Sequence, residues 1–417
     1  MSRTAVRLQR FGAAGACLAL GIGLAACSGS TSSSDSGSSS STSSSGKASG
    51  PIQLGTIDAM TGDYAVLGAQ VNSGVVAAVN AVNKAGGLLG QQIKLTTLDD
   101  QSSATMAQQQ VSQLKSQYKA VAIMGPEDST SISAAVPEAT NLQLPDVVSS
   151  AAWPNGLSTA QTAWAWSATV NTTDGIERYI TYFKQHNIKS VAIIGNGTPF
   201  SQQLQTYFSA QGSSLPFKIV ANEQFTAGAT DVSPQISRAL AAKPQFVLSW
   251  VSGTDQVNVI KTYKRLGSSV PLGINGGNAG SAVRKAIGDA NLQGVFCLAY
   301  PTQFINQMPS GWTSKQAAQQ YLSDMQAAGK DADGGASNAV LGWDAAMTLI
   351  DGIKAAGSTS NTAIQQALDA QTYVGATSTF HRTADAHSAA DPGGYVLAQS
   401  QGSAWKLVLA AQPGSTG

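Results

Sequence analysis

From Ile52 onward, short apolar runs alternate with stretches whose apolar residues recur at helical spacing, and this alternation restricts the fold more than any other feature of the chain. The runs are short enough to be strands. They lie at residues 52–58, 93–98, 121–124, 191–194, 217–220 and 246–251. Repeated β-α units predict parallel sheets covered by helices on both faces. A break near Asn171 divides the units into two blocks, which predicts two α/β lobes.

The C-terminal part of the chain has a different pattern. Helical stretches at 316–325 and 338–353 follow one another, and strand-like pieces from Thr377 onward end in the run 405–409. A segment of this kind, placed after both blocks, is expected to be shared between the lobes. We predict an N-terminal lobe of residues 51–170 plus about 300–376, and a C-terminal lobe of residues 171–299 plus about 377–412.

The beginning of the chain has the composition of an export signal. Arginines precede an apolar run at 11–23, which is too short to span a bilayer comfortably. The run ends in Leu-Ala-Ala before Cys27, the lipobox pattern in which the cysteine is diacylated after cleavage. An ordinary cleavage site beside an incidental cysteine is the alternative. We expect residues 1–26 to be removed, Cys27 to carry lipid, and the Ser-rich residues 27–50 to form a tether.

The charge and cysteine content exclude several kinds of partner and cross-link. The net charge is +1 and 11% of the residues are charged, which argues against a nucleic-acid partner and against membrane binding through a basic patch. Loss of Cys17 with the signal segment and lipidation of Cys27 would leave Cys297 alone, so we expect no disulfide. Cys297 lies in an apolar run and is expected to be a buried, unreactive thiol.

The loops that follow the predicted strands are the candidate ligand-binding segments. Ligands bind at the carboxyl ends of the strands in open parallel sheets, so two lobes that face each other would line one cleft with these loops. The loops are 59–64, 125–131, 149–153, 195–200, 252–255 and 275–278.

Motifs along the folded part occur in the same order as in a known family. They are Gly-Asp-Tyr-Ala-Val-Leu-Gly at 62–68, Asn-Lys-Ala-Gly-Gly-Leu-Leu-Gly at 83–90, Leu-Asp-Asp-Gln at 98–101, a Ser/Thr run within 125–133, and Leu-Gly-Trp-Asp-Ala-Ala at 341–346. Together they resemble the leucine/isoleucine/valine-binding family of periplasmic-binding-type importers.

The resemblance implies a type I periplasmic-binding fold, in which two Rossmann-like parallel-sheet lobes are joined by three crossovers and a ligand cleft lies between them. It also implies an extracytoplasmic solute-binding lipoprotein, anchored by Cys27 to the outer face of the bacterial cytoplasmic membrane. Such a protein delivers a small polar molecule, by family default an amino acid and often a branched-chain one, to the permease of an ABC importer. A ligand-sensing receptor for a non-amino-acid ligand, such as an aromatic or other carboxylate or an amide, is the alternative. We expect a monomer without a cofactor.

The family's carboxylate-binding residues fall on two segments of the N-terminal lobe. One is Ser129 with Thr130, at the predicted start of a helix, where free N–H groups favour an anion; simple helix capping is the alternative. Trp153 would either wall the pocket or pack in the core. The second segment comprises Ser150, Ala151 and Ala152, where the last residue replaces the family's threonine.

The remaining contacts that the family implies are aromatic. Phe200 keeps a ring at its position, whereas Ser252 does not, although Trp250 lies close by in sequence. The aromatic residue of the first loop falls on Leu67, with Tyr64 as a nearby substitute.

The acidic residue that holds the ammonium group of an amino acid in this family falls on Gly276 here. A buried ammonium without a carboxylate partner costs several kcal/mol, so two hypotheses remain. In the first, the ammonium is bound by another acid: Glu127, Asp128 or Asp255. In the second, the ligand lacks an ammonium, and Asn275 and Asn278 bind a neutral polar group.

Motifs of common enzyme classes are absent: the chain has no Gly-x-Ser-x-Gly elbow, Walker loop or Cys-x-x-Cys pair. The glycine-rich stretch 273–280 lacks the Gly-x-Gly-x-x-Gly spacing of a phosphate-binding loop. A metal site formed by His381, Asp385, His387 and Asp391 is imaginable, but we expect a solvated connection between strands, because no apolar surroundings are evident. We therefore expect neither a bound metal nor an enzyme.

Overall fold

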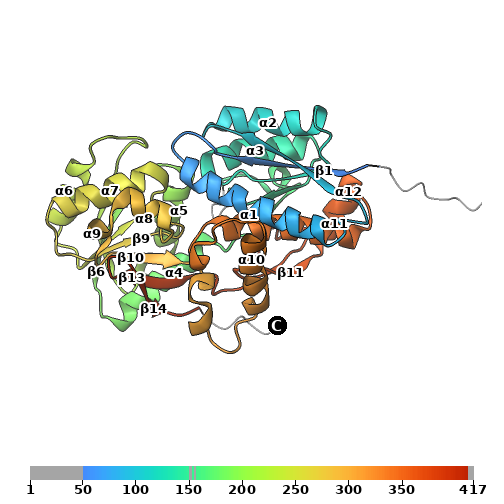
Figure 1. Cartoon of the computed structure of the whole chain (residues 1–417). Helices are drawn as coiled ribbons and strands as arrows, with labels where there is room; N and C mark the ends of the chain where they lie inside the picture. The colour runs from blue at the N-terminus through green and yellow to red at the C-terminus, as the bar shows by residue number, and fades with distance from the viewer. Residues whose placement is uncertain (1–49, 150–152, 155, 412–417) are drawn as a thin grey trace, which may run out of the picture. The chain divides into compact units, whose positions relative to one another are not determined.

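Two largely parallel β-sheets organise the part of the chain that the computed structural model describes, residues 50–149, 153–154 and 156–411 (Figure 1). The first sheet has five parallel strands in the order β2-β1-β3-β4-β5. The second has seven strands in the order β14-β13-β10-β9-β8-β6-β7, of which β13 and β14 pair antiparallel. The two-lobed α/β architecture predicted from the alternating runs is confirmed.

Each apolar run that was predicted to be a strand overlaps a strand of the structure. The first sheet contains β1 (Ile52–Asp58), β2 (Ile93–Asp99), β3 (Ala122–Met124), β4 (Asp146–Val148) and β5 (Ala165–Ser167). The second contains β6 (Ser190–Gly195), β7 (Lys218–Gln224), β8 (Phe246–Ser249), β9 (Leu272–Ile274), β10 (Phe296–Ala299), β13 (Val396–Ser400) and β14 (Trp405–Leu409). A separate ribbon consists of β11 (Thr372–Val374) and β12 (Thr379–His381).

Helices from both ends of the chain cover the first sheet (Figure 1). One face carries α1 (Ala65–Lys84) and α11 (Ala339–Ala356), and the other carries α2 (Ala104–Ser116) and α3 (Ser129–Asn141). The alternation of side chains along β1 explains both layers, because Leu54 packs on the α1 side and Ile57 packs on the α2 and α3 side. Outside these layers, α10 (Lys315–Ala327) packs on α1, and α12 (Asn361–Asp369) packs on α11.

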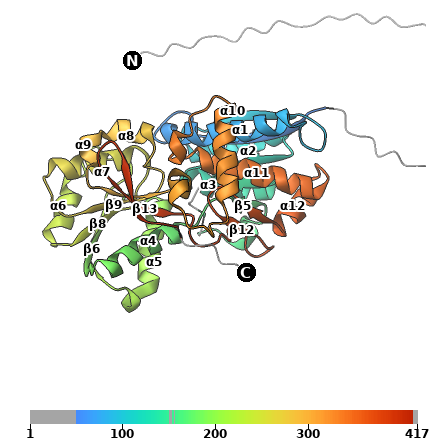
Figure 2. The same ribbon diagram turned by 60° about the horizontal axis from the view of Figure 1, so that its bottom comes forward.

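The second sheet is covered in the same manner. Figure 2 shows α4 and α5 below its strands, α7 to α9 above them and α6 at their left, where it packs on β6 and β7. These helices are α4 (Thr172–Gln185), α5 (Pro199–Gln211), α6 (Ser233–Ala241), α7 (Gly253–Arg265), α8 (Ser281–Ile287) and α9 (Asp289–Leu292). Short 3-10 helices occur at Thr159–Gln161, Gly212–Ser214, Pro301–Gln307 and Asp333–Gly335. The chain passes between the two sheets after β5, after β10 and after β12, which gives the three crossovers.

Glycines allow α1 and α11 to approach unusually closely. A Cβ atom on Gly74 would lie 1.8 Å from the carbonyl oxygen of Ala339. A Cβ atom on Gly342 would lie 2.0 Å from the carbonyl oxygen of Val71. The contact between the first and the penultimate long helices therefore depends on the absence of side chains at both positions.

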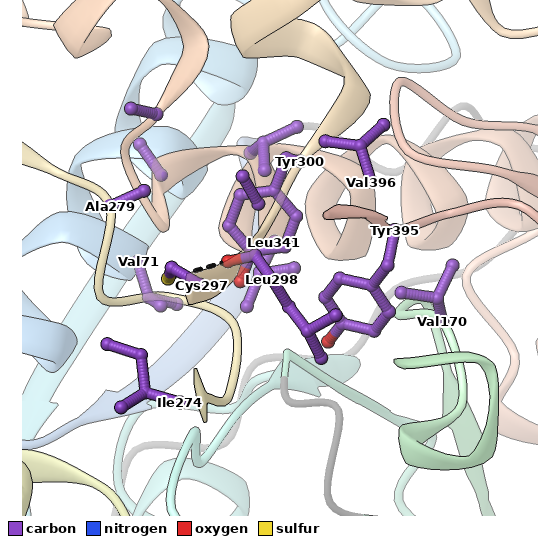
Figure 3. Packing of buried hydrophobic residues seen from close by; sticks show 14 of the residues in the cluster. Val71, Val170, Ile274, Ala279, Cys297, Leu298, Tyr300, Leu341, Tyr395 and Val396 are labelled. Atoms are coloured by element: carbon purple, nitrogen blue, oxygen red, sulfur yellow. Dashed lines mark hydrogen bonds between the residues drawn. The ribbon is translucent and has the colours of Figure 1, made fainter. Parts of the chain in front are cut away.

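Cys297 is a buried core residue, as its apolar run predicted. Figure 3 shows it packed near Ile274 and Leu298, and it is fully shielded from solvent. Burial raises the pKa of its thiol, so the reactive thiolate is disfavoured.

The segment with two histidines differs from its expected solvated state. His387 is buried and stacks on Trp166, with ring centroids 5.2 Å apart. Its Nε2 lies 3.2 Å from a carboxylate oxygen of Asp369, whereas His381 is exposed and lies 3.3 Å from Asp391. The two histidines thus pair with different acids. Among the described residues, no group of His, Cys, Asp and Glu has the arrangement of a metal site.

Candidate functional site

A cavity of about 160 Å³ lies at the carboxyl ends of the strands of both sheets. The segments after β1, β3 and β4 line it from the first sheet, and those after β6, β8, β9 and β10 line it from the second. Open α/β sheets bind ligands at this position. The predicted residues that line the cavity are Tyr64, Ser129, Phe200, Trp250, Ser252, Asn275, Gly276 and Asn278.

Two predicted residues lie away from the cavity walls. The Thr130 side chain is exposed, and the residue contributes only a backbone N–H bond to Asp128. Trp153 packs against the cluster that contains Ile132 and Val136, so the core-packing alternative describes it better than a pocket wall. Four further predicted residues lie outside the described residues: Cys27, Ser150, Ala151 and Ala152.

Aromatic rings form two walls of the cavity. The rings of Phe200 and Trp250 are stacked, with centroids 5.9 Å apart and planes inclined by 16°. Tyr300 and Tyr395 form a second stacked pair at 5.9 Å, and Figure 3 shows Leu298 beside both of them. This second pair was missed from the sequence, because its members come from two crossovers and not from loops that follow the repeated β-α units.

Tyr395 also accounts for the glycine at position 276. A Cβ atom on Gly276 would lie 2.7 Å from Cε1 of the Tyr395 ring. An acidic side chain therefore has no room at this position. The ring of Tyr395 occupies the space that a larger residue would need.

The start of α3 is capped by the protein's own carboxylate. Asp128 accepts hydrogen bonds from the backbone N–H groups of Thr130 and Ser131, each at 2.9 Å. The Ser129 hydroxyl accepts a bond of 3.2 Å from the backbone N–H of Phe200, which belongs to the second lobe. The Ser129 hydroxyl and the N–H groups of Thr130 and Ser131 are thus engaged within the protein, and the residue that caps the helix is Asp128 and not one of the serines or the threonine.

Carboxyl groups gather around this helix start. Glu127 lines the cavity and accepts the backbone N–H of Ala59 at 3.1 Å. Burial, together with the neighbouring charges of Asp58, Asp128 and Asp100, raises the pKa of Glu127 well above its usual value. No lysine, arginine or histidine is among the described residues that line the cavity.

Asp255, the third acid considered for an ammonium, is used elsewhere. Its carboxylate accepts bonds from the Asn196 side chain at 2.8 Å and from the Gly228 backbone at 3.1 Å, and it does not line the cavity. It therefore ties two loops of the second lobe together.

The two asparagines proposed for a neutral group are also partly engaged. The Asn275 amide donates to the carbonyl oxygen of Val251. The Asn278 amide donates to Asn275 and to the carbonyl oxygen of Gly276. Their amide groups shape the loop after β9 and leave few donors for a ligand.

Comparison with known proteins identifies the family. The profile described as periplasmic binding protein matches residues 51–404. The chain belongs to the periplasmic binding protein family. This family consists of solute-binding receptors, so the expectation of a small-molecule binding protein of type I fold is confirmed at the level of the family. No curated protein sequence matches the chain.

Solved structures of several other proteins have the same fold as this binding protein. An extracellular ligand-binding receptor from Rhodopseudomonas palustris is 21% identical, with a TM-score of 0.76 over 86% of this chain and 99% of that one. The LivJ protein of Streptococcus pneumoniae, solved with isoleucine, is 19% identical, with a TM-score of 0.74 over 86% and 99%. A Rhodopseudomonas palustris solute-binding protein in complex with benzoate is 19% identical, with a TM-score of 0.73 over 88% and 98%.

The buried carboxyls predict how the stability of the binding protein depends on pH. Burial raises the pKa of Asp58 from 3.8 to about 7 and that of Asp100 to about 6. Both groups hold a proton more tightly in the folded chain than in the unfolded one. Their contribution to stability is therefore complete below about pH 4 and is lost as the pH rises through about 6 to 7.

We expect Asp58→Asn to keep the bonds from Thr56 and Asn72 at 2.8 and 3.0 Å, and to make the free energy of unfolding less dependent on pH. Urea denaturation between pH 4 and pH 8 measures this slope. The exposed Asp385→Asn is the control and should leave it unchanged. An identical slope in Asp58→Asn and the parent protein would contradict the prediction.

Proposed function

We propose that this protein is an extracytoplasmic lipoprotein that captures a small molecule between its lobes and delivers it to the permease of an ABC importer. Its lipid anchor is Cys27, and the Ser-rich segment 27–50 is the tether between the anchor and the folded lobes, 51–170 with about 300–376 and 171–299 with about 377–412. The cavity between the carboxyl ends of the two sheets is the observation that carries the proposal.

The size of the cavity supports a small ligand. Its volume of about 160 Å³ is close to that of an engineered cavity that binds benzene, about 150 Å³. A molecule whose apolar body is about the size of one six-membered ring fits this space. Sugars larger than one ring and peptides are too large for it.

Contacts across the cleft support capture by closure. Phe200 donates its N–H to Ser129 at 3.2 Å, and the Gln203 amide donates to the carbonyl oxygen of Trp153 at 3.0 Å. Both bonds join α5 of the second lobe to segments of the first. Closure of two lobes around a site shields the ligand from water and holds it during transfer.

The import function is tested in the host. Native mass spectrometry of the purified protein identifies the retained ligand, and uptake of that ligand is then compared in cells with and without the chain. Loss of uptake supports import. Normal uptake together with a lost response to the ligand would refute import and favour the sensing alternative. Membrane fractionation of Cys27→Ser, which should release the protein, tests the anchor.

Ligand binding should change the fluorescence of Trp250. This residue lines the cavity while being 1% exposed, and its ring stacks on Phe200. A ligand that contacts either ring changes the surroundings of the indole. We expect the fluorescence change to disappear in Trp250→Phe and to persist in Trp343→Phe, because Trp343 is buried on α11 and binds Asp324 instead. A change that persists in Trp250→Phe would place the ligand elsewhere.

A further inference from the structure

We propose that the cavity takes a small organic cation, an amine with an apolar or aromatic body and without a carboxylate beside the amine. This inference rests on the proposed binding function and narrows it to one ligand class. Three features carry it: the N–H groups of Thr130 and Ser131 are already engaged by Asp128, no described cationic side chain lines the cavity beside its carboxyls, and part of the cavity wall is aromatic.

A ligand carboxylate at the start of α3 would meet the carboxylate of Asp128. The N–H groups of Thr130 and Ser131 both point to Asp128, at 2.9 Å each. A second carboxylate at this helix end would have to displace Asp128 or lie beside its charge. Two like charges side by side in a buried site repel each other more strongly than they would in water.

The same carboxyls favour a positive charge. Asp128 is 4% exposed and Glu127 is 2% exposed, yet both line the cavity. Buried charges are normally paired, and no lysine, arginine or histidine is among the described residues that line the cavity, so a positive charge beside these acids would have to come from the ligand.

Aromatic side chains complete the surroundings of such a cation. Tyr64 lines the cavity beside these acids, and its pKa is raised by burial and then by the charges of Asp128, Asp255, Asp63 and Glu127. It therefore lies in their negative field. The stacked rings of Phe200 and Trp250 provide π faces for an ammonium or for an aromatic body.

Binding of a cation beside Glu127 should depend on pH. Glu127 faces Asp58 from β1, Asp100 from the segment after β2, and Asp128 from the start of α3, and burial and these charges raise its pKa. A bound cation would favour the ionised carboxylate. Amine binding should therefore release a proton, and affinity should rise with pH until Glu127 is ionised in the free protein.

Titration calorimetry with matched compounds tests the ligand class. Phenethylamine, 3-phenylpropionate and phenylalanine share a phenyl ring on a two-carbon chain and differ in charge. 3-Methylbutylamine, 4-methylpentanoate and leucine form an aliphatic set. We expect the amine of at least one set to bind about tenfold or more tightly than its carboxylate and its amino acid. The binding enthalpy should also vary with the ionisation enthalpy of the buffer.

Variants separate a charge effect from a folding effect. Glu127→Gln and Asp128→Asn should each weaken amine binding by about tenfold or more, and asparagine keeps the helix cap. Glu138→Gln is the matched control on the same helix, because Glu138 bonds Ser112 outside the cavity and should leave affinity unchanged. Circular dichroism confirms that each variant is folded.

Three results would contradict the proposed cation class. Binding of the carboxylate or amino acid as tightly as the amine would overturn the cation class and leave the proposed binding function standing. Binding of the amine with unchanged affinity in both Glu127→Gln and Asp128→Asn would also overturn it. If no compound binds and no ligand is recovered from the host, the cation class and the proposed function both fail.

Discussion

Replacing Gly74 by alanine is expected to lower the free energy of unfolding by about 3 kcal/mol, at the upper end of the range for overpacked cores. The added Cβ would lie 1.8 Å from the carbonyl oxygen of Ala339 and 2.8 Å from the backbone nitrogen of Trp343. Both atoms belong to the backbone of α11, so no side-chain rotation relieves the clash. The two helices would have to separate, and the core between them and the first sheet would lose contacts.

Urea denaturation followed by circular dichroism measures this loss. Gly311→Ala is the matched control, because no atom lies within 4 Å of a Cβ at that position and its φ is negative. The control should change stability by less than about 0.5 kcal/mol. Equal stability of Gly74→Ala and Gly311→Ala would show that α1 and α11 can separate at little cost.

Replacing Gly253 by leucine is expected to weaken ligand binding by about 100-fold while the protein stays folded. Gly253 begins α7 in the second lobe. Its Cβ would lie 2.9 Å from the carbonyl oxygen of Asp63 and 3.1 Å from the ring of Tyr64, both of which follow β1 in the first lobe. A side chain there would hold the lobes apart. A cost of about 2.7 kcal/mol to the closed arrangement corresponds to this loss of affinity.

A backbone effect must be separated from this steric one. Gly253 has φ +63°, a conformation that strains any residue with a Cβ atom. Gly267 has φ +68° in the same lobe with no neighbour within 4 Å, so Gly267→Leu carries the strain without the clash. Calorimetry should show normal affinity in this control. Small-angle X-ray scattering with ligand should show a larger radius of gyration for Gly253→Leu, and equal radii would contradict the prediction.

The repeated part of the fold was predictable because its cores follow simple periods. Short, mostly buried runs mark strands such as β1, and apolar residues at every third or fourth position mark helices such as α1. The short strand β4 was given no residue range, although the loop after it was named, and β5 was not assigned, since each has three residues and no room for a pattern. Burial of His387 was also missed, because its apolar neighbour Trp166 is remote in sequence.

The candidate site was predictable only where it follows the strands of the repeated units. Tyr64 and Phe200 lie in loops that the strand-end rule named and line the cavity, whereas Trp250, which also lines it, was considered only because it precedes Ser252 in sequence. Tyr300 and Tyr395 could not be placed, because a crossover has no periodicity that reports which way its side chains face. The sequence therefore offers no reason for a glycine at position 276, whereas the structure explains it by the close packing of Tyr395.

The role of the helix start was equally hard to predict from sequence. Capping and anion binding use the same N–H groups, and the same residue types favour both. Only the direction of the Asp128 carboxylate decides between them, and that direction depends on tertiary packing.

The elements α11, β13 and β14 are synthesised late, yet each lobe contains at least one of them. One face of the first sheet has α1 but lacks α11 until that helix has been made, and β10 lacks its antiparallel neighbour until β13 has been made. A chain that emerges from the ribosome with its N-terminus first therefore cannot complete either lobe early. Until then, the uncovered apolar surface and the unpaired edge of β10 make the partial chain prone to aggregate.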